Sequence, residues 1–262
     1  MYLRNTTSAI FCATGELAAA AARGLHREGA DVYLSAREPE RAAALATELD
    51  TAPAAGVDVL EEAAVEAWLR DVRERTGRLD LVFNGVGPSA AAAGSGTAST
   101  ALDYDRFTEG VSLIVGGQFL TARVAARLWQ EWGETGTIVL LTSSMSRIKA
   151  GNMTVISTAS AALEGLARTL AAEYGRYGIR VVCVNGTAFP ETETIQETTA
   201  LQAAAAGVPP AVIAESMASG YSLGRGPSLK EFGDLVAFLA TDAGAILNSH
   251  VVHADRGALS VV

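Results

Sequence analysis

Cysteine is scarce in this chain of 262 residues, which contains only Cys12 and Cys183. Both cysteines lie inside apolar runs of the kind that form buried strands. A disulfide framework needs several paired cysteines in a small, loop-rich chain, so we expect none here. This use of cysteine is typical of a protein in a reducing cytoplasm.

Basic residues are fewer than acidic ones. The chain has 20 Lys and Arg and 29 Asp and Glu, which gives a formal net charge of −9. Like charges repel, so this balance argues against a nucleic acid or an anionic membrane as a partner. No apolar run approaches the roughly 18 residues of a membrane span. Glu16 interrupts the apolar N-terminal stretch, which therefore predicts a strand and a helix rather than a signal peptide. We expect a cytoplasmic protein.

Metal-ligand patterns are absent from the sequence. Its three histidines are His26, His250 and His253, and no pair of them has metal-ligand spacing with a third ligand in view. Surface or packing roles are the better interpretation of these side chains. The sequence therefore predicts no metal site.

What the chain does contain is a regular alternation of short apolar runs and helical periodicity, with 49% hydrophobic residues. This pattern is typical of a parallel sheet covered by helices on both faces. Strands are predicted at Ser8–Ala13, Asp31–Ser35, Gly56–Val59, Leu79–Asn84, Gly136–Thr142, Ile179–Val184 and Val251–Ala254. Helices are predicted at Leu17–Glu28, Pro39–Leu49, Glu61–Thr76, Asp105–Trp132, Met153–Tyr177 and Ser228–Thr241. We predict an α/β fold, a Rossmann-type doubly wound parallel sheet of about seven strands, in a single domain over residues 1–262.

Two stretches break this alternation. Pro88–Thr100 is small, flexible and uncharged, which predicts a loop. Phe189–Ser222 is a longer insert after the sixth strand, at the carboxyl edge where open sheets bind ligands. We interpret this insert, residues 189–222, as a substrate lid of one or two short helices.

The segment Ile138–Leu166 carries the most specific motif, IVLLTSSMSRIKAGNMTVISTASAALEGL. An apolar run that ends in serines, followed by a loop and a long alanine-rich helix, resembles the active-site segment of the short-chain dehydrogenases/reductases. The resemblance places Ser143 at the position of the family's catalytic serine. A tyrosine and a lysine follow that serine in the family, and here their positions hold Ile156 and Ser160. The position of the family's catalytic asparagine corresponds to Ile114.

These replacements bear on the chemistry, because reduction of a carbonyl requires a proton for the oxygen as well as a hydride. The family's tyrosine supplies that proton, and a phenol with a pKa of about 10 needs a neighbouring ammonium to be useful near neutral pH. Isoleucine has no proton to give, and serine carries no charge. Lys149, in the loop after the serines, is a candidate acid or anion-binding group. An exposed loop cation is the plainer interpretation of this lysine.

The segment IFCATGELAAAAARGL lies where the first strand of a Rossmann fold turns into its helix. By resemblance to the family's GxxGxxG variant, Cys12, Gly15 and Ala18 take the glycine positions, and contacts with a dinucleotide are expected from Cys12, Gly15 and Leu17. A Cβ at Cys12 crowds the turn if that residue has a positive φ. Backbone amides at the start of the helix remain available to a phosphate, and Glu16 opposes it if its carboxylate faces that phosphate.

The adenosine end of this predicted cofactor site follows the second strand, where Arg37 stands at the position of an acidic residue in NAD-selective relatives. A guanidinium without a carboxylate suits the 2′-phosphate of NADP, so the expected cofactor is NADP(H). Asp58 and Val59 match the family's adenine-contacting pair. Asn84, Gly85, Val86 and Gly87 take the positions of its Asn-Asn-Ala-Gly turn, from which Gly85 and Val86 depart. We expect Asn84 to brace the sheet rather than to touch substrate.

The resemblance extends over almost the whole chain. The strand GIRVVCVNGTAF has Val182 and Gly186–Thr187 where the family has an asparagine and a Pro-Gly pair. In the family that strand ends beside the nicotinamide, so the departures from the family pattern gather around the reactive end of the cofactor. The helix predicted at Asp105–Trp132 corresponds to a dimer face, and the resemblance implies a homodimer or homotetramer.

Three functions remain open at this point. The first is an NADP-dependent reductase of an already activated small molecule, such as an iminium, which accepts a hydride without protonation. The second is a non-redox enzyme of specialised metabolism, a cyclase, isomerase or dehydratase, that uses its pocket to position a substrate. The third is a catalytically silent binding or partner subunit. Hydride transfer, turnover without nicotinamide, and occupancy without turnover would distinguish the three.

Overall fold

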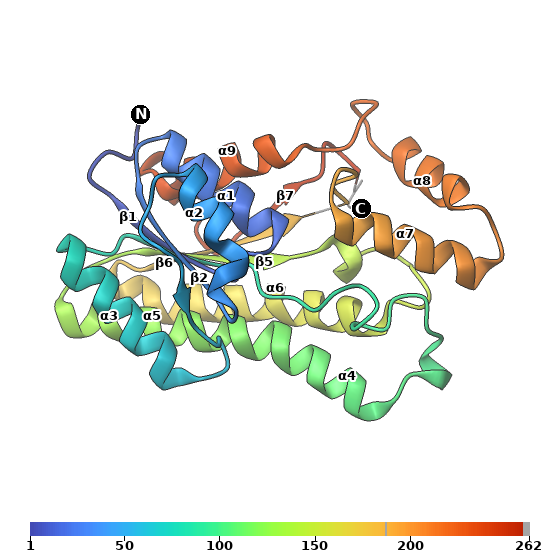
Figure 1. Ribbon diagram of the computed structural model, residues 1–262, viewed down its shortest axis with the longest axis horizontal. Helices are drawn as coiled ribbons and strands as arrows, with labels where there is room; N and C mark the ends of the chain where they lie inside the picture. The colour runs from blue at the N-terminus through green and yellow to red at the C-terminus, as the bar shows by residue number, and fades with distance from the viewer. Residues whose placement is uncertain (187, 259–262) are drawn as a thin grey trace.

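The computed structural model describes residues 1–186 and 188–258. Its centre is a sheet of seven parallel strands in the order β3-β2-β1-β4-β5-β6-β7 (Figure 1). The strands are β1 (Thr7–Phe11), β2 (Asp31–Ala36), β3 (Ala55–Gly56), β4 (Leu81–Asn84), β5 (Thr137–Thr142), β6 (Arg180–Gly186) and β7 (Val251–Ala254). The strand order reverses between β1 and β4, and ligands of such sheets bind at the carboxyl ends near this reversal. The predicted Rossmann-type parallel sheet is confirmed.

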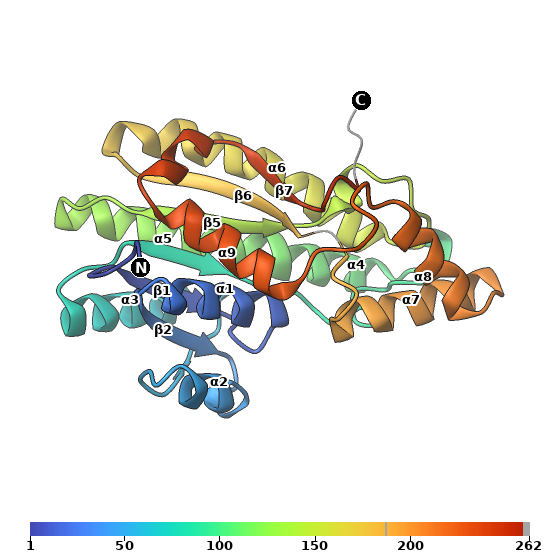
Figure 2. The ribbon, with the colours of Figure 1, turned by 90° about the horizontal axis from the view of Figure 1, so that it is seen from above.

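Helices cover both faces of the sheet (Figure 1 and Figure 2). One face carries α1 (Glu16–Arg27), α2 (Ala43–Glu48) and α9 (Leu229–Ala240), and the other carries α3 (Glu62–Thr76), α5 (Gly117–Trp132) and α6 (Thr154–Tyr174). α4 (Tyr104–Val111) packs against α6, and α7 (Glu193–Ala206) packs against α8 (Pro210–Ser219). Short 3-10 turns lie at Pro39–Ala42, Ser99–Ala101, Ser144–Ser146, Gly175–Tyr177 and Ala243–Leu247. The 189–222 insert thus contains α7 and α8, beside the carboxyl ends of the strands.

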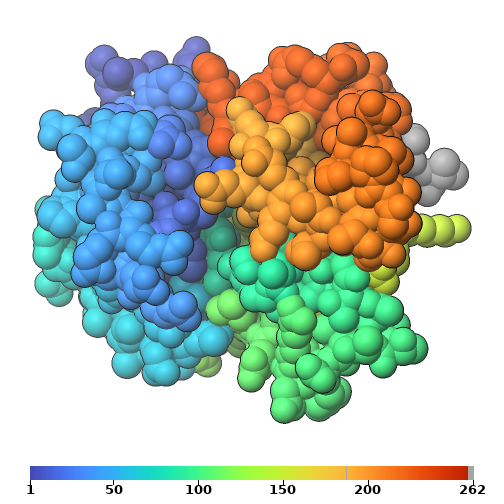
Figure 3. Space-filling view, turned by 45° about the vertical axis from the view of Figure 1, so that its right-hand side comes forward, coloured from blue at the N-terminus to red at the C-terminus, as the bar shows by residue number. Residues whose placement is uncertain are grey.

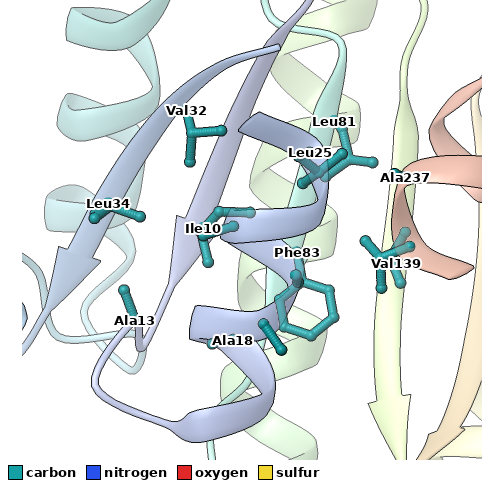
Figure 4. Packing of buried hydrophobic residues seen from close by; sticks show 14 of the residues in the cluster. Ile10, Ala13, Ala18, Leu25, Val32, Leu34, Leu81, Phe83, Val139 and Ala237 are labelled. Atoms are coloured by element: carbon teal, nitrogen blue, oxygen red, sulfur yellow. The ribbon is translucent and has the colours of Figure 1, made fainter. Parts of the chain in front are cut away.

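Successive side chains of each strand point to opposite faces of the sheet and build two apolar layers. In β1, Ile10 packs on the side of α1 and α9, whereas Phe11 packs on the side of α3 and α5. Figure 4 shows the first of these layers, in which Leu25 of α1 and Phe83 of β4 belong to one cluster. Burial of both faces explains why the strands are nearly continuous apolar runs in the sequence.

The helices α1 and α9 cross with their backbones in contact. A Cβ built on Gly24 would lie 2.1 Å from the carbonyl oxygen of Gly233. A Cβ built on Gly233 would lie 2.3 Å from the carbonyl oxygen of Ala20. Only glycine permits this approach, and the small alanines of α1 fill the rest of the buried face.

Element boundaries differ from the sequence predictions where the backbone changes conformation. β1 ends at Phe11 because Cys12 has a φ of +57°, in the left-handed region. The helix predicted at Asp105–Trp132 contains a π-helical turn at Ser112–Gly116, which the hydrophobic pattern does not reveal. The strand predicted at Gly56–Val59 is observed at Ala55–Gly56, where these two residues pair with β2.

The helical stretch Tyr104–Trp132 is long and apolar enough to cross a membrane by length and composition, with a hydropathy of 1.2 over its 18-residue window. The expectation that no stretch of the chain meets this measure is therefore wrong for this helix. Half of the window is buried inside the protein. The core helix of a globular fold gives the same result, so this stretch is weak support for a membrane span.

Candidate active site

A cavity of about 750 Å³ lies at the carboxyl ends of β1, β4, β5 and β6, where the 189–222 segment covers it. Figure 3 shows this end of the molecule, with the segment (orange) against the chain that leads into α4 (green). Most of the cavity wall is apolar, and its larger apolar side chains include Leu17, Ile114, Ile156, Leu163, Phe189 and Met217. Such a wall suits a bulky and mainly apolar small molecule.

The hydroxyls of Ser143 and Ser160 form a pair in this cavity, with 2.8 Å between their Oγ atoms. Ser143 follows the end of β5, and its Oγ also accepts a hydrogen bond from the backbone N–H of Met145. Ser160 lies on α6, and its carbonyl oxygen accepts a hydrogen bond from Thr142 Oγ1. The pair can therefore orient one hydroxyl proton toward a polar atom of a ligand.

Two isoleucines form the apolar part of the wall near the serines. Ile156 lies one helical turn before Ser160 on α6, so both side chains share a face of that helix. Ile114 is buried on the π-helical turn between α4 and α5 and also lines the cavity. π-turns often occur at functional sites because they reorient side chains. The three positions where the resemblance expects tyrosine, lysine and asparagine thus all border one cavity.

The loop after Ser143 is anchored to α6 through a carboxylate. Glu164 is 7% exposed and accepts hydrogen bonds from Ser146 Oγ (2.6 Å) and from Arg147 (2.9 Å). Burial disfavours the charged carboxylate, but the hydrogen bonds from Arg147 and Ser146 outweigh it and hold the pKa of Glu164 below its usual value. Lys149 in the same loop is exposed and also lines the cavity. No hydrogen bond in the described part of the chain fixes its ammonium.

The turn after β1 contains Cys12 in the left-handed conformation that glycine adopts most easily. The N–H of Gly15 donates to the carbonyl oxygen of Cys12 and closes the turn. Burial raises the pKa of the Cys12 thiol to about 12, the carboxylate of Asp58 adds to this effect, and Arg37 opposes it. The thiol is therefore neutral at physiological pH and is a poor nucleophile.

Helix α1 begins directly after this turn, with Gly15 as its N-cap and no side chain bonded there as a cap. Glu16, its first residue, points its carboxylate across to α7 and accepts the N–H of Glu193 at 2.9 Å and 3.2 Å. Glu193 is the first residue of α7. The first turns of the two helices therefore meet at one carboxylate, beside Gly15 and Leu17, which line the cavity.

Two of the residues predicted at the adenosine end, Arg37 and Asp58, lie close enough to Cys12 to act on its thiol electrostatically. The side chain of Arg37 is 75% exposed, with its nearest carboxylate, Glu38, 4.0 Å away. Asp58 accepts the N–H of Leu60 at 2.9 Å, and Val59 is buried. Within the described residues, the cavity reaches Gly85 and Gly15 but is not lined by Arg37, Asp58, Val59 or Cys12.

Asn84 and Gly85 continue β4 into the cavity wall. The amide of Asn84 donates to the carbonyl oxygen of Gly117 (3.1 Å) and to Thr121 Oγ1 (3.0 Å), and its Oδ1 accepts the N–H of Val86 (2.9 Å). Asn84 therefore ties β4 to α5. Gly85 faces α1, where a Cβ would lie only 2.9 Å from the Cβ of Ala18. The counterpart of the family's Pro-Gly pair ends at Thr187, which lies outside the described residues.

Carboxylates and amides fasten the 189–222 segment to the rest of the chain. Glu197 accepts the N–H groups of Ala90 (2.9 Å) and Ala91 (3.2 Å) in the loop after β4. Gln202 donates to the carbonyl oxygen of Asn152 at 3.2 Å. The segment is thus fastened along α7, at Glu197 and Gln202 as well as at its first residue, Glu193.

Two residues of the cavity wall could not be predicted from the sequence. Ser95 is 5% exposed and, among the described residues, its Oγ has no hydrogen-bond partner. Tyr221 is also buried, donates its hydroxyl to the carbonyl oxygen of Ala188 at 2.7 Å, and has a phenol pKa raised by that burial and then by Asp255. Both residues lie in long irregular stretches, where no periodicity tells which side chains face inward.

No group of three or more His, Cys, Asp or Glu side chains in the described part of the chain could hold a metal ion. His26 lies on α1 and His250 precedes β7. His253 lies on β7, close enough to Glu164 to act on it electrostatically. The histidines are thus spread over separate elements rather than gathered at the cavity.

Comparison with protein families gives a match over residues 13–258 to the family model described as enoyl-(acyl carrier protein) reductase. Among curated proteins, momilactone A synthase of Oryza sativa subsp. japonica is 31% identical over 253 residues, which covers 94% of this chain and 86% of that protein. Levodione reductase of Leifsonia aquatica is 32% identical over 245 residues, with coverage of 90% and 86%.

Comparison with solved structures agrees with these sequence matches. The crystal structure of levodione reductase has a TM-score of 0.86 and 28% identity, and covers 97% of this chain and 98% of that one. The structure of NAD+-bound xylitol dehydrogenase has a TM-score of 0.89 at 23% identity, with coverage of 98% and 100%, which supports the likeness of fold alone.

Proposed function

The chain belongs to the short-chain dehydrogenase/reductase family, and from this premise we propose that it is an NADP(H)-dependent oxidoreductase of an already activated acceptor. The proposed acceptor is an iminium or a similarly activated group. The observation that carries the proposal is the pairing of Ser143 with Ser160 beside Ile156, in the apolar cavity at the carboxyl ends of the strands. Function is argued here from these side chains, because the fold by itself serves many reactions.

The residues around the β1 turn fit a nicotinamide dinucleotide. Gly85 packs so closely on Ala18 that a Cβ would lie 2.9 Å away, which is the close packing of strand and first helix that small residues permit in a dinucleotide-binding fold. Cys12, Gly15, Leu17 and Gly85 would hold the diphosphate and the adjoining ribose, and Arg37, Asp58 and Val59 would hold the adenosine end. Asn84 would brace the sheet through its bonds to α5. When bound, the nicotinamide supplies or accepts a hydride.

NADP is preferred over NAD in this proposal because of Arg37. Its side chain is 75% exposed, and among the described residues its ion pair is with Glu38, at 4.0 Å. A 2′-phosphate offers a better partner through charge-assisted bonds. Asp58 does not compete for it, since its carboxylate accepts the N–H of Leu60.

Ser143 is the residue that touches the reacting group in this scheme. Its hydroxyl donates to Ser160 Oγ, which leaves a lone pair of Ser143 Oγ to accept the N–H of an iminium and so orient the acceptor. A serine hydroxyl does not release its proton near neutral pH, and the isoleucines add none. An iminium needs no proton, because it already carries the positive charge that the hydride cancels.

The other titratable groups of the cavity wall do not replace the missing acid at Ser143. Among the described residues they are Glu16, Lys149 and Tyr221. Glu16 is engaged with the N–H of Glu193, and Tyr221 donates to the carbonyl oxygen of Ala188. Lys149 is exposed in its loop. Simple ketone reduction is therefore slow in this proposal.

A second candidate is a non-redox enzyme, a cyclase, isomerase or dehydratase, that positions its substrate in the same apolar cavity. The left-handed Cys12 favours it, because a side chain at this position narrows the turn that receives a dinucleotide. A silent binding subunit is the third possibility.

We further propose a single cytoplasmic domain that forms a homodimer or homotetramer, with the 189–222 segment as its substrate lid.

Titration of the purified protein with NADPH and NADH by calorimetry is the first test. Tight binding with NADPH preferred would support the reductase, and turnover of a cyclic iminium panel with NADPH would complete it. Absence of binding for both would leave the non-redox enzyme and the silent binding subunit.

The double variant Ile156→Tyr with Ser160→Lys tests the role assigned to the missing acid. It should gain NADPH-dependent reduction of simple ketones, while Ile156→Phe with Ser160→Met, of similar bulk, should not. A double variant that binds NADPH and stays inert toward a broad ketone panel would show that more than the acid is missing.

A further inference from the structure

The contact between Glu16 and α7 places one negative charge beside the first turns of two helices. Glu16 is the first residue of α1, and its two carboxylate oxygens lie 2.9 Å and 3.2 Å from the backbone nitrogen of Glu193. The contact joins two elements that are far apart in the sequence. It therefore connects the helix of the proposed diphosphate site directly to the segment that covers the cavity.

The carboxylate satisfies groups that would otherwise lack partners. The first N–H groups of a helix have no acceptor within the helix, and the helix dipole favours a negative charge beside them. In α7, Thr192 Oγ1 caps the N–H of Ile195, and Glu16 takes the N–H of Glu193. In α1, no side chain caps the first turn, so Glu16 is the anion that both helix starts share.

A dinucleotide brings a second anion to the same place. In a Rossmann-type fold the diphosphate lies against the start of the first helix, where N–H groups and the dipole attract it. Glu16 and Leu17 belong to that first turn, and both line the cavity. The carboxylate and the diphosphate are both negative, so they compete for the same attractive field and repel each other.

We propose that Glu16 sets the affinity of this protein for its dinucleotide, because its carboxylate holds α7 against α1 in the free protein and is displaced when the diphosphate binds. This inference rests on the proposed function. Displacement frees the N–H of Glu193 and loosens the start of α7. The contacts of Glu197 with Ala90 and Ala91 remain, so the segment opens at the Glu16 end.

The test measures binding with calorimetry for the wild type and for Glu16→Gln, Glu16→Ala and Glu74→Gln. Glu74 is exposed on α3, on the opposite face of the sheet from α1, so its variant removes the same charge far from the contact. NADPH should bind about tenfold tighter or more to both Glu16 variants, the size expected for the loss of one like charge near a diphosphate. Adenosine 2′-monophosphate lacks the diphosphate, so its affinity should stay unchanged.

Hydrogen exchange of the backbone amides in residues 188–206 provides a second readout. Glu16→Ala should raise exchange at the start of α7 without any ligand, because it removes the acceptor for Glu193. In the wild type, NADPH should raise exchange at the same amides. Unchanged exchange there in both cases would overturn the proposed release of α7.

The results separate this inference from the proposed function. Equal NADPH affinity in the wild type and in both Glu16 variants would overturn the role of Glu16 and leave the reductase standing. NADPH binding by the Glu16 variants alone would support the inference. Absence of dinucleotide binding in every variant, each with a native thermal transition, would overturn both.

Discussion

The substitution Gly24→Ala should destabilise the fold strongly, although alanine is the better helix former. A Cβ at residue 24 would lie 2.1 Å from the carbonyl oxygen of Gly233 and 2.3 Å from its carbonyl carbon. Ordinary contacts between such atoms exceed 3 Å, so α1 and α9 must separate by about 1 Å along their shared face. The obstacle is backbone on α9, which cannot move aside as a side chain can.

The magnitude follows from two opposing contributions. Overpacking costs about 1–3 kcal/mol, and the rigid obstacle places this site at the upper end of that range. Alanine gains about 1 kcal/mol over glycine in a helix interior. Gly24→Ala should therefore lower the free energy of unfolding by about 2 kcal/mol.

The matched control is Gly165→Ala on α6, where a Cβ would meet only the end of Arg168, 3.9 Å away. This variant should be more stable than the wild type by up to about 1 kcal/mol, because only the helix propensity changes. Urea denaturation of all three proteins at one concentration, followed by circular dichroism, gives the two differences. A Gly24→Ala protein as stable as Gly165→Ala would refute the backbone contact between α1 and α9.

The remaining predictions concern single side chains. Burial raises the pKa of both thiols, Cys12 and Cys183, to about 12, so iodoacetamide at pH 8 should label the native protein very slowly and the urea-unfolded protein completely. Rapid labelling of the native protein would contradict the raised pKa values. Glu164→Gln should cost about 1 kcal/mol at pH 7, because the partly exposed Arg147 loses the charge of a buried carboxylate. The folded pKa of Glu164 is depressed, so this contribution is present above the unfolded pKa of about 4.3 and is lost as the pH falls toward the folded value; denaturation curves of variant and wild type should converge in acid, and a constant difference would argue against the pair. Arg37→Ala should weaken NADPH binding about tenfold and leave NADH binding unchanged, and an equal loss for both cofactors in calorimetry would exclude a 2′-phosphate contact.

The fold was readable from the sequence because strands buried on both faces leave continuous apolar runs. Ile10 and Phe11 face different layers, yet both are apolar, so the strand stands out clearly from the helices around it. The π-helical turn at Ser112–Gly116 was not foreseen, since one additional residue in a turn leaves the apolar content unchanged. β1 ends where the φ of Cys12 changes sign, which composition does not encode.

The candidate site could be predicted from the sequence in part. The spacing of Ile156 and Ser160 on one helix places both on one face, and Ser143 follows the neighbouring strand end, so a common cavity could be expected from the sequence. The contact of Glu16 with Glu193 depends on how α7 folds back over the sheet. No local sequence pattern encodes a contact between residues so far apart in the chain. The inward orientation of Ser95 could not be predicted for the same reason.

The π-helical turn also sets the rotational phase of the long helix that it interrupts. One additional residue in a turn rotates everything on one side of it by about 100° relative to an unbroken α-helix. α4 can therefore turn its apolar side chains toward α6, where Gly110 lies close to Val155, while α5 turns its own toward α3 and the sheet. A continuous helix with one residue fewer would satisfy only one of these two interfaces. The wall that Ile114 contributes to the cavity thus depends on a single inserted residue in the helix backbone.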